Sequence, residues 1–175
     1  MNELIVRVRE VLSTTPDRWR TLTASVELEL LERRPAPGEW SALECLQHLL
    51  DTEVGAFSVR LQAFLEGRDF AAFDPDADDS RPELAADPAA VAARFGEARA
   101  RSLASLEVVS EADLDRTARH PELGQVTLGE MLNEWAAHDL MHTVQAERAV
   151  MQPFIVESGP WRFYFADHDA GAVGS

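Results

Sequence analysis

The sequence predicts an all-α protein, a four-helix bundle with a long crossover between its second and third long helices. Apolar residues recur at helical spacing over segments of about 20 residues or more, which is typical of bundles. These segments have recognisable capping residues and end near glycine or proline. Strand signals occur only in "GQVT" and "PFIVE", each too short to build a sheet alone.

The N-terminal part of the chain supplies the first helix of the bundle, which we expect in two pieces. Thr15 and Pro16 interrupt the helical pattern, because proline lacks a backbone donor and clashes with the preceding turn. The prediction is a short helix over residues 3–12 and a main one over residues 16–31. "RRPAPGEW", residues 33–40, then forms the turn into the second long helix.

The second long helix has clear signals at both ends. Ser41 with Glu44 forms a capping box, and Gly67 suits the C-terminal end. The following segment, "DFAAFDPDADDSRPELAADP", is acidic and contains several prolines, so we expect a long surface crossover. It lacks the ligand spacing and the glycine of an EF-hand, so no calcium site is predicted there.

The third and fourth long helices are delimited in the same way. Asp87 and Pro88 are suited to the N-cap and first turn of the third helix. Thr127 with Glu130 forms a second capping box and begins the fourth helix, which is predicted to run to Pro153.

The length of 175 residues predicts a single domain over residues 1–169, followed by a disordered tail over residues 170–175. The net charge of −15 argues against a surface that neutralises phosphates, so nucleic acid is not an expected partner. All 16 basic residues are arginine, which excludes lysine-based Schiff-base chemistry.

Cysteine content and hydropathy indicate the compartment. Cys45 is the only cysteine, so an intrachain disulfide and a CxxC motif are both excluded. The N-terminus lacks the apolar core of a signal peptide, and no segment is apolar over the length needed to span a membrane. We therefore expect a cytoplasmic protein that does not bind a membrane.

"EWAAHDLMH", residues 134–142, places His138 and His142 four residues apart in the fourth helix. Residues of this spacing lie on one helical face, where two imidazoles can bind one ion. Both histidines belong to the predicted core seam, whose spacing alternates between three and four residues: Leu128, Met131, Trp135, His138, His142, Gln145 and Ala149.

The histidine pair alone leaves two interpretations open. Buried histidines often only form hydrogen bonds, and Glu134, Asp139 and Glu147 are near in sequence. A metal site would be favoured by a third ligand from another helix.

The candidates for that third ligand are His48, His120 and His168. His48 lies at the edge of the apolar arc of the second helix, so periodicity permits but does not require it to face the fourth. Glu53, on the inner face of the same helix, is a candidate for a fourth ligand or for orienting one.

Two longer segments carry a family resemblance. "RRPAPGEWSALECLQHLLDTE", followed far downstream by "HPELGQVTLGEMLNEWAAHDLMHTVQAERA", resembles the DinB-like superfamily of metal-binding four-helix bundles. The resemblance extends over most of residues 16–165. It implies that His48, His138 and His142 hold a divalent metal ion, which can be nickel, zinc or iron, and that the protein forms a homodimer.

Three neutral imidazoles leave coordination positions open, an arrangement typical of catalytic sites. A metal there can lower the pKa of a bound water or a substrate thiol. Related bundles include transferases that use mycothiol, bacillithiol or glutathione, and thiol-dependent maleylpyruvate isomerases. The resemblance therefore implies a metal-dependent thiol S-transferase or isomerase with a low-molecular-weight thiol and a small-molecule substrate.

Two alternatives belong to other classes. The protein can be a non-catalytic, stress-related metal-binding bundle, or a metal-dependent hydrolase. A hydrolase would need a general base, for which Glu53 and Glu134 are candidates. The catalytic residues are otherwise not indicated by the sequence.

Overall fold

The computed structural model describes residues 2–70, 73 and 87–171. Helices dominate these residues, and a single two-stranded hairpin accompanies them. The elements in chain order are α1 (Glu3–Ser25), α2 (Leu28–Glu32), α3 (Ala42–Thr52), the π-helical segment η1 (Glu53–Phe57), α4 (Ser58–Glu66), α5 (Pro88–Ser105), the 3-10 turns η2 (Leu106–Val108) and η3 (Glu111–Asp113), β1 (Thr117–His120), β2 (Gly124–Thr127), α6 (Leu128–Glu157) and the 3-10 segment η4 (Gly159–Phe165).

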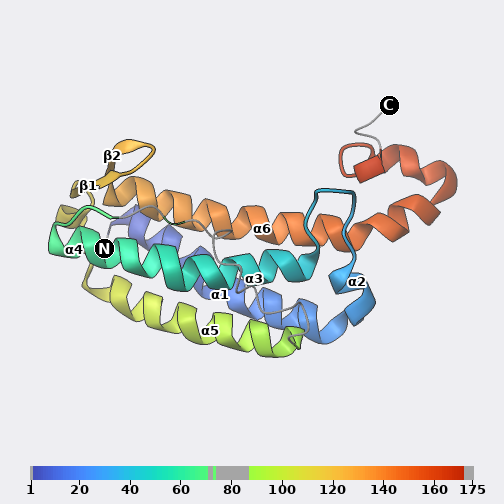
Figure 1. The fold of residues 1–175 in the computed structure, drawn as a ribbon, viewed down its shortest axis with the longest axis horizontal. Coiled ribbons are helices and arrows are strands. Elements are labelled where there is room, and N and C mark those ends of the chain that lie inside the picture. Colours follow the sequence, from blue (N-terminus) through green and yellow to red (C-terminus); the bar gives the residue numbers. More distant parts are fainter. Residues whose placement is uncertain (1, 71–72, 74–86, 172–175) are drawn as a thin grey trace.

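Four long helical segments lie side by side, and the predicted four-helix bundle is confirmed (Figure 1). One segment consists of α3, η1 and α4 in direct succession, and the others are α1, α5 and α6. Both α1 and α3 pack against α5 and α6. A long connection joins α4 to α5, as expected, although residues 71–72 and 74–86 of the predicted crossover lie outside the described residues.

Helix α1 is continuous, so the predicted break at Thr15 and Pro16 is wrong. A proline at position 16 leaves the Leu12 carbonyl without its usual donor four residues on. Arg99 of α5 donates from Nη1 to that carbonyl oxygen over 3.0 Å. Because a neighbouring helix satisfies the freed acceptor, α1 continues through the proline.

The predicted helix ends are confirmed where capping residues mark them. Ser41 with Glu44, and Thr127 with Glu130, form complete capping boxes. Gly67 ends α4 in the left-handed conformation with φ of 66°, which glycine adopts without strain.

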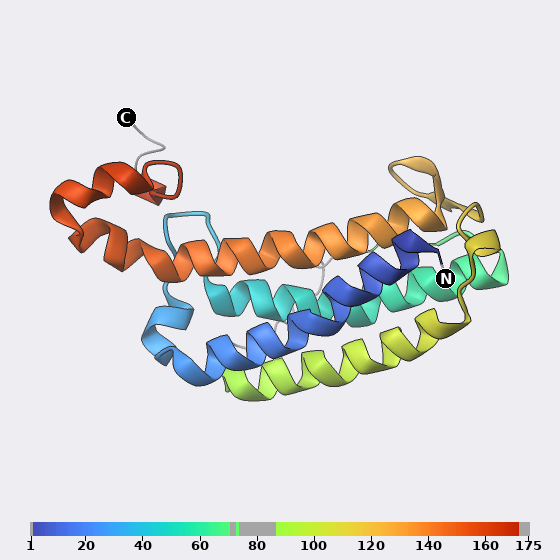
Figure 2. The same ribbon diagram turned by 180° about the vertical axis from the view of Figure 1, so that it is seen from behind.

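Helix α6 runs further than predicted, through Pro153 to Glu157. A proline in the last turns removes only one backbone hydrogen bond, and the burial of Ile155 holds the turn that follows. "PFIVE" is therefore helical. "GQVT" is β2, which pairs antiparallel with β1 so that Thr117 faces Thr127. Figure 2 shows this hairpin at one end of the bundle, with η4 at the other end of α6.

The core consists of two apolar clusters with polar residues between them. One cluster joins the first half of α1 to α4 and the start of α6, and the other joins the second half of α1 to α3 and α5. The buried polar side chains between these clusters are Thr15, Glu53, Arg99, Asp139 and His142. This polar layer crosses the middle of the bundle and positions the site described below.

Within the described part of the chain, no helix is long and apolar enough to cross a membrane. The predicted tail begins at residue 170, where Ala170 is buried and donates its backbone N–H to Gln152 over 2.8 Å. Residues 172–175 of that tail lie outside the described residues.

Candidate metal centre

Three of the predicted histidines come together from two helices. One ring nitrogen from each of His48, His138 and His142 lies within 4.8 Å of the others. His48 Nε2 and His138 Nε2 are 3.1 Å apart. Two nitrogens bound at about 2.05 Å to one tetrahedral ion would be about 3.3 Å apart, so this spacing fits a shared ion. His120 and His168 do not join this histidine cluster.

Aromatic rings enclose the histidine cluster. Trp40, from the loop before α3, stacks on His142 with ring centroids 5.6 Å apart and lies 4.8 Å from His48. Phe57 of η1 meets His138 edge-on at 5.2 Å. These rings limit the access of water, which strengthens electrostatic interactions inside the cluster.

Burial keeps the imidazoles of α6 neutral. Burial, together with smaller contributions from the neighbouring histidines and arginines, lowers the pKa of His138 to about 3. Burial also lowers the pKa of His142, against the opposing effect of its hydrogen bond to Gln145. His142 Nδ1 lies 2.9 Å from Gln145 Oε1, which fits an Nδ1–H donor and leaves the Nε2 lone pair for a metal.

The donor set fits a divalent cation. Nε2 of His138 faces Nε2 of His48, and the hydrogen bond between His142 Nδ1 and Gln145 leaves Nε2 of His142 as the third donor. Three neutral imidazole nitrogens directed at one place form the donor set typical of a catalytic metal site. Imidazole suits zinc, nickel and iron alike.

A buried ion network lies next to the histidine cluster, and the sequence did not reveal it. Arg99 of α5 donates two hydrogen bonds of 2.9 Å to Glu53. It also donates to Asp139 over 2.6 and 2.9 Å. Trp135 Nε1 donates to Glu53 over 3.1 Å. We call these four residues the ion network; one guanidinium here serves two carboxylates.

The pattern of α5 contains a signal for this network. Arg99 follows Phe95 by four residues and so shares its buried face. A fully buried arginine is rare unless it is paired with acidic groups. Asp139 lies closer to the centre of the buried face of α6 than His138 does, since Asp139 is 1% exposed and His138 is half-buried.

The two carboxylates predicted to assist the metal have different surroundings. Both oxygens of Glu53 already accept hydrogen bonds, from Arg99 and Trp135, and these bonds would have to break before Glu53 could reach an ion. Glu134 is an exposed residue one turn before His138. Desolvation raises the pKa of its carboxyl group, while the positive charge of Arg60 opposes that shift.

The π-helical segment η1 places Glu53 and Phe57 at these sites. π-Helical turns in long helices are frequent at functional sites because they shift the side-chain register. Gly55 in this segment is covered by Phe73, since a Cβ atom at position 55 would lie 2.4 Å from the Phe73 ring. Only glycine allows this close approach.

Arg148, Arg162 and Cys45 do not belong to the histidine cluster. Arg148 pairs with Glu39, and Arg162 pairs with Asp169 at 2.5 Å. Cys45 is completely buried, and burial raises the pKa of its thiol to about 12. None of these side chains is prepared to act at the histidine cluster.

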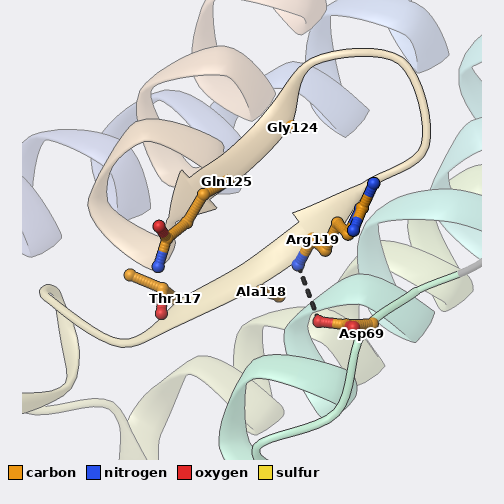
Figure 3. Close-up of a pocket in the computed structure, with 6 residues that line it drawn as sticks. All are labelled: Asp69, Thr117, Ala118, Arg119, Gly124 and Gln125. Carbon is orange, nitrogen blue, oxygen red and sulfur yellow. Dashed lines mark hydrogen bonds between the residues drawn. The ribbon is translucent and has the colours of Figure 1, made fainter.

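A shallow pocket lies elsewhere, beside the β-hairpin (Figure 3). Its volume is about 330 Å³. Asp69 accepts a hydrogen bond of 2.8 Å from the backbone N–H of Arg119 at its edge. The pocket contains none of the clustered histidines; its lining residues are Asp69, Thr117, Ala118, Arg119, Gly124 and Gln125.

The sequence matches the DinB superfamily over residues 12–146. The chain belongs to the DinB superfamily. The match includes all three residues of the histidine cluster, and it confirms the resemblance found in the sequence. No curated protein matches the chain.

Two solved structures share the fold. YfiT from Bacillus subtilis is described as a probable metal-dependent hydrolase with an unusual four-helix bundle topology. It is 19% identical with a TM-score of 0.75, over 85% of this chain and 87% of YfiT. The DinB-like protein YjoA from Bacillus subtilis is 21% identical with a TM-score of 0.55, over 82% of this chain and 90% of its own.

Proposed function

We propose that this DinB-superfamily protein binds a divalent metal ion through His48, His138 and His142 and uses the open coordination positions to act on a small molecule. The observation that carries this proposal is the convergence of three imidazole nitrogens within 4.8 Å in a site enclosed by aromatic rings. The description of YfiT as a probable metal-dependent hydrolase supports it.

The chain's own residues prepare the site. A bound ion would supply a Lewis acid that lowers the pKa of a water or thiol in an open position. Gln145 orients His142, and Trp40 and Phe57 exclude water from the cluster. Arg99 neutralises the buried carboxylates, so they do not compete as charged ligands.

Thiol transfer or isomerisation is the reaction that we propose first. A free thiol has a pKa of about 8.5 and water one of about 15.7, so a thiol needs less help from a base. The buried carboxylates beside the cluster are already bound to Arg99 and are not free to act as bases. The thiol would be a low-molecular-weight cofactor such as mycothiol, bacillithiol or glutathione, because Cys45 remains protonated.

Hydrolysis is the second candidate, and Glu134 is the observation that favours it. This carboxylate lies one turn before His138, and desolvation raises its pKa, as suits a general base. The third possibility is a metal that only holds α3 and α6 together, in a non-catalytic binding protein.

Metal analysis tests the site itself. We expect near-stoichiometric divalent metal in the wild-type protein after purification or reconstitution, and its loss in His138→Ala. The matched control is His120→Ala, which removes a histidine outside the cluster and should retain the metal. Equal metal content in all three proteins would contradict the ligand assignment.

Cobalt-loaded protein separates the three functional alternatives. A thiol transferase should show a thiolate-to-cobalt charge-transfer band when mycothiol, bacillithiol or glutathione is added, and Glu134→Gln should not abolish it. A hydrolase should bind no thiol and should lose ester or amide hydrolysis in Glu134→Gln. A spectrum that no added ligand changes would identify a closed, structural site.

We also propose that two copies pair through the outer face of α6. Met141 and Val144 are more than half exposed there, and such apolar side chains on one helical face favour association. Light scattering should give a dimer for the wild type and a monomer for Val144→Glu. A wild-type monomer at micromolar concentration would contradict this pairing.

A further inference from the structure

Arg60 is a half-buried arginine of α4 that forms no ion pair with an acidic side chain in the described part of the chain. Its Nε atom is buried and has no hydrogen-bond partner within the described residues. Its guanidinium lies over the Phe70 ring at 5.3 Å. Arg99, in contrast, donates five hydrogen bonds. A desolvated guanidinium without an acceptor is unfavourable, so Arg60 requires explanation.

The neighbour of Arg60 is His120 of β1, whose Nε2 atom faces the guanidinium and not an acceptor. His120 Nδ1 accepts backbone N–H groups from Glu122 at 3.1 Å and Leu123 at 3.3 Å. A nitrogen that accepts hydrogen bonds carries no proton, so the ring proton is on Nε2. That Nε2–H lies 3.3 Å from Arg60 Nη2, which is also a donor.

Two donors therefore meet without an acceptor between them. Nε2 of His120 and Nη2 of Arg60 point at one another, and Nε of Arg60 is a further unsatisfied donor in the same guanidinium. An oxyanion that takes hydrogen bonds from these groups would satisfy all three. The planar fork of arginine binds a carboxylate through two parallel hydrogen bonds.

This donor pair lies beside the histidine cluster. Arg60 is three residues after Phe57, whose ring contacts His138. Helix α4 also contacts β1, which carries His120. The donor pair and the Phe57 contact to His138 therefore lie on consecutive turns of the same helical segment.

We propose that Arg60 and His120 bind the carboxylate group of the small-molecule substrate while its reacting part lies at the histidine cluster. This inference rests on the proposed function and specifies its substrate class. A carboxylate fits better than a phosphate, because one guanidinium balances one negative charge. A dianion would leave a charge uncompensated.

The test is a titration of the metal-free protein with acetate and its neutral isostere acetamide, followed by ¹⁵N resonances of the histidine rings. The chain has five histidines, so each can be assigned with a single substitution. We expect acetate to move the His120 Nε2 resonance in a saturable way and acetamide to leave it unchanged. Arg60→Gln should weaken acetate binding at least tenfold, and Arg60→Lys should weaken it less.

The matched control is Arg94→Gln, which removes an exposed arginine of α5 and the same charge. It should bind acetate like the wild type. Equal binding in Arg60→Gln and Arg94→Gln would overturn the proposal, and so would equal shifts with acetamide. Inorganic phosphate that binds more tightly than acetate would overturn the choice of a carboxylate.

A zinc-loaded sample then separates this inference from the proposed function. Failure to bind zinc, together with an intact acetate response, would contradict the metal site but leave the carboxylate site. Bound zinc without an acetate response at His120 would contradict the carboxylate site but leave the metal site. When both hold, acetate should also shift the resonances of His138, because the two sites share one substrate.

Discussion

The ion network and the histidine cluster lie side by side at the middle of the bundle. They differ in how far the hydrogen bonds of their buried polar groups are satisfied within the protein. His138 and Asp139 are consecutive residues of α6, and each belongs to one of the two. Arg99 satisfies Asp139 and Glu53 completely within the protein. His138 Nδ1 has no partner among the described residues, and its Nε2 faces another imidazole.

This difference in hydrogen bonding distinguishes groups that hold the helices together from groups that can bind a ligand. A buried polar group that its own chain satisfies fixes how helices pack, and here Arg99 connects α1, η1, α5 and α6. A buried polar atom that has no partner among the described residues can receive one from solution. His138 Nδ1 and Arg60 Nε are atoms of this second kind.

The largest expected effect is on the ion network. Arg99→Met should leave two buried carboxylates without their counter-charge and lower the free energy of unfolding by about 3–5 kcal/mol. Urea unfolding at pH 7 measures this loss. Arg94→Met, an exposed position on the same helix, should change the stability by about 0.5 kcal/mol or less. Similar losses in both variants would show that the network contributes little.

The histidine cluster should contribute to stability only when metal is present. At a metal concentration a hundredfold above Kd, binding should raise the free energy of unfolding by about 2.7 kcal/mol. The same metal should have little effect on His142→Ala. Far-UV circular dichroism should show unchanged helicity after chelation, because apolar burial holds the bundle. Loss of helicity on chelation would make the centre structural instead.

The histidine cluster should also make the stability of the metal-free protein depend on pH. Unfolded histidine takes up a proton below about pH 6.5, whereas folded His138 does so only near pH 3. The unfolded state then binds more protons, so stability falls as the pH drops between these values, by at most about 1.4 kcal/mol per pH unit. Unfolding of metal-free wild type and His138→Phe at pH 7, 6 and 5 measures the effect. Parallel pH profiles would exclude it.

Much of the bundle could be predicted because helix ends are determined locally. Capping boxes at Ser41 and Thr127 involve residues three apart, so their signal is complete in the sequence. The break predicted at Pro16 was wrong for the opposite reason. The donor that satisfies the Leu12 carbonyl is Arg99, 87 residues away in the chain.

The candidate site could be predicted only in part. Periodicity placed His138 and His142 on the inner face, but it left His48 at the edge of an arc, and the family resemblance selected it. Arg99 was missed because arginine is most often a surface residue. Arg60 lies just beyond the π-helical segment, which shifts the register of every residue after Glu53 relative to a regular helical wheel.

The smallest expected effect concerns Cys45, which lies one turn before His48 but belongs neither to the histidine cluster nor to the ion network. Its thiol is completely buried, and burial raises its pKa to about 12, so it should stay protonated and unreactive at pH 8. A thiol reagent should label it only after unfolding in urea, with or without metal. Cys45→Ala should cost about 1 kcal/mol and retain the metal, because it removes one small apolar group. Rapid labelling that metal suppresses would instead place Cys45 in the metal centre, and the histidine cluster would then have a fourth donor from its own chain.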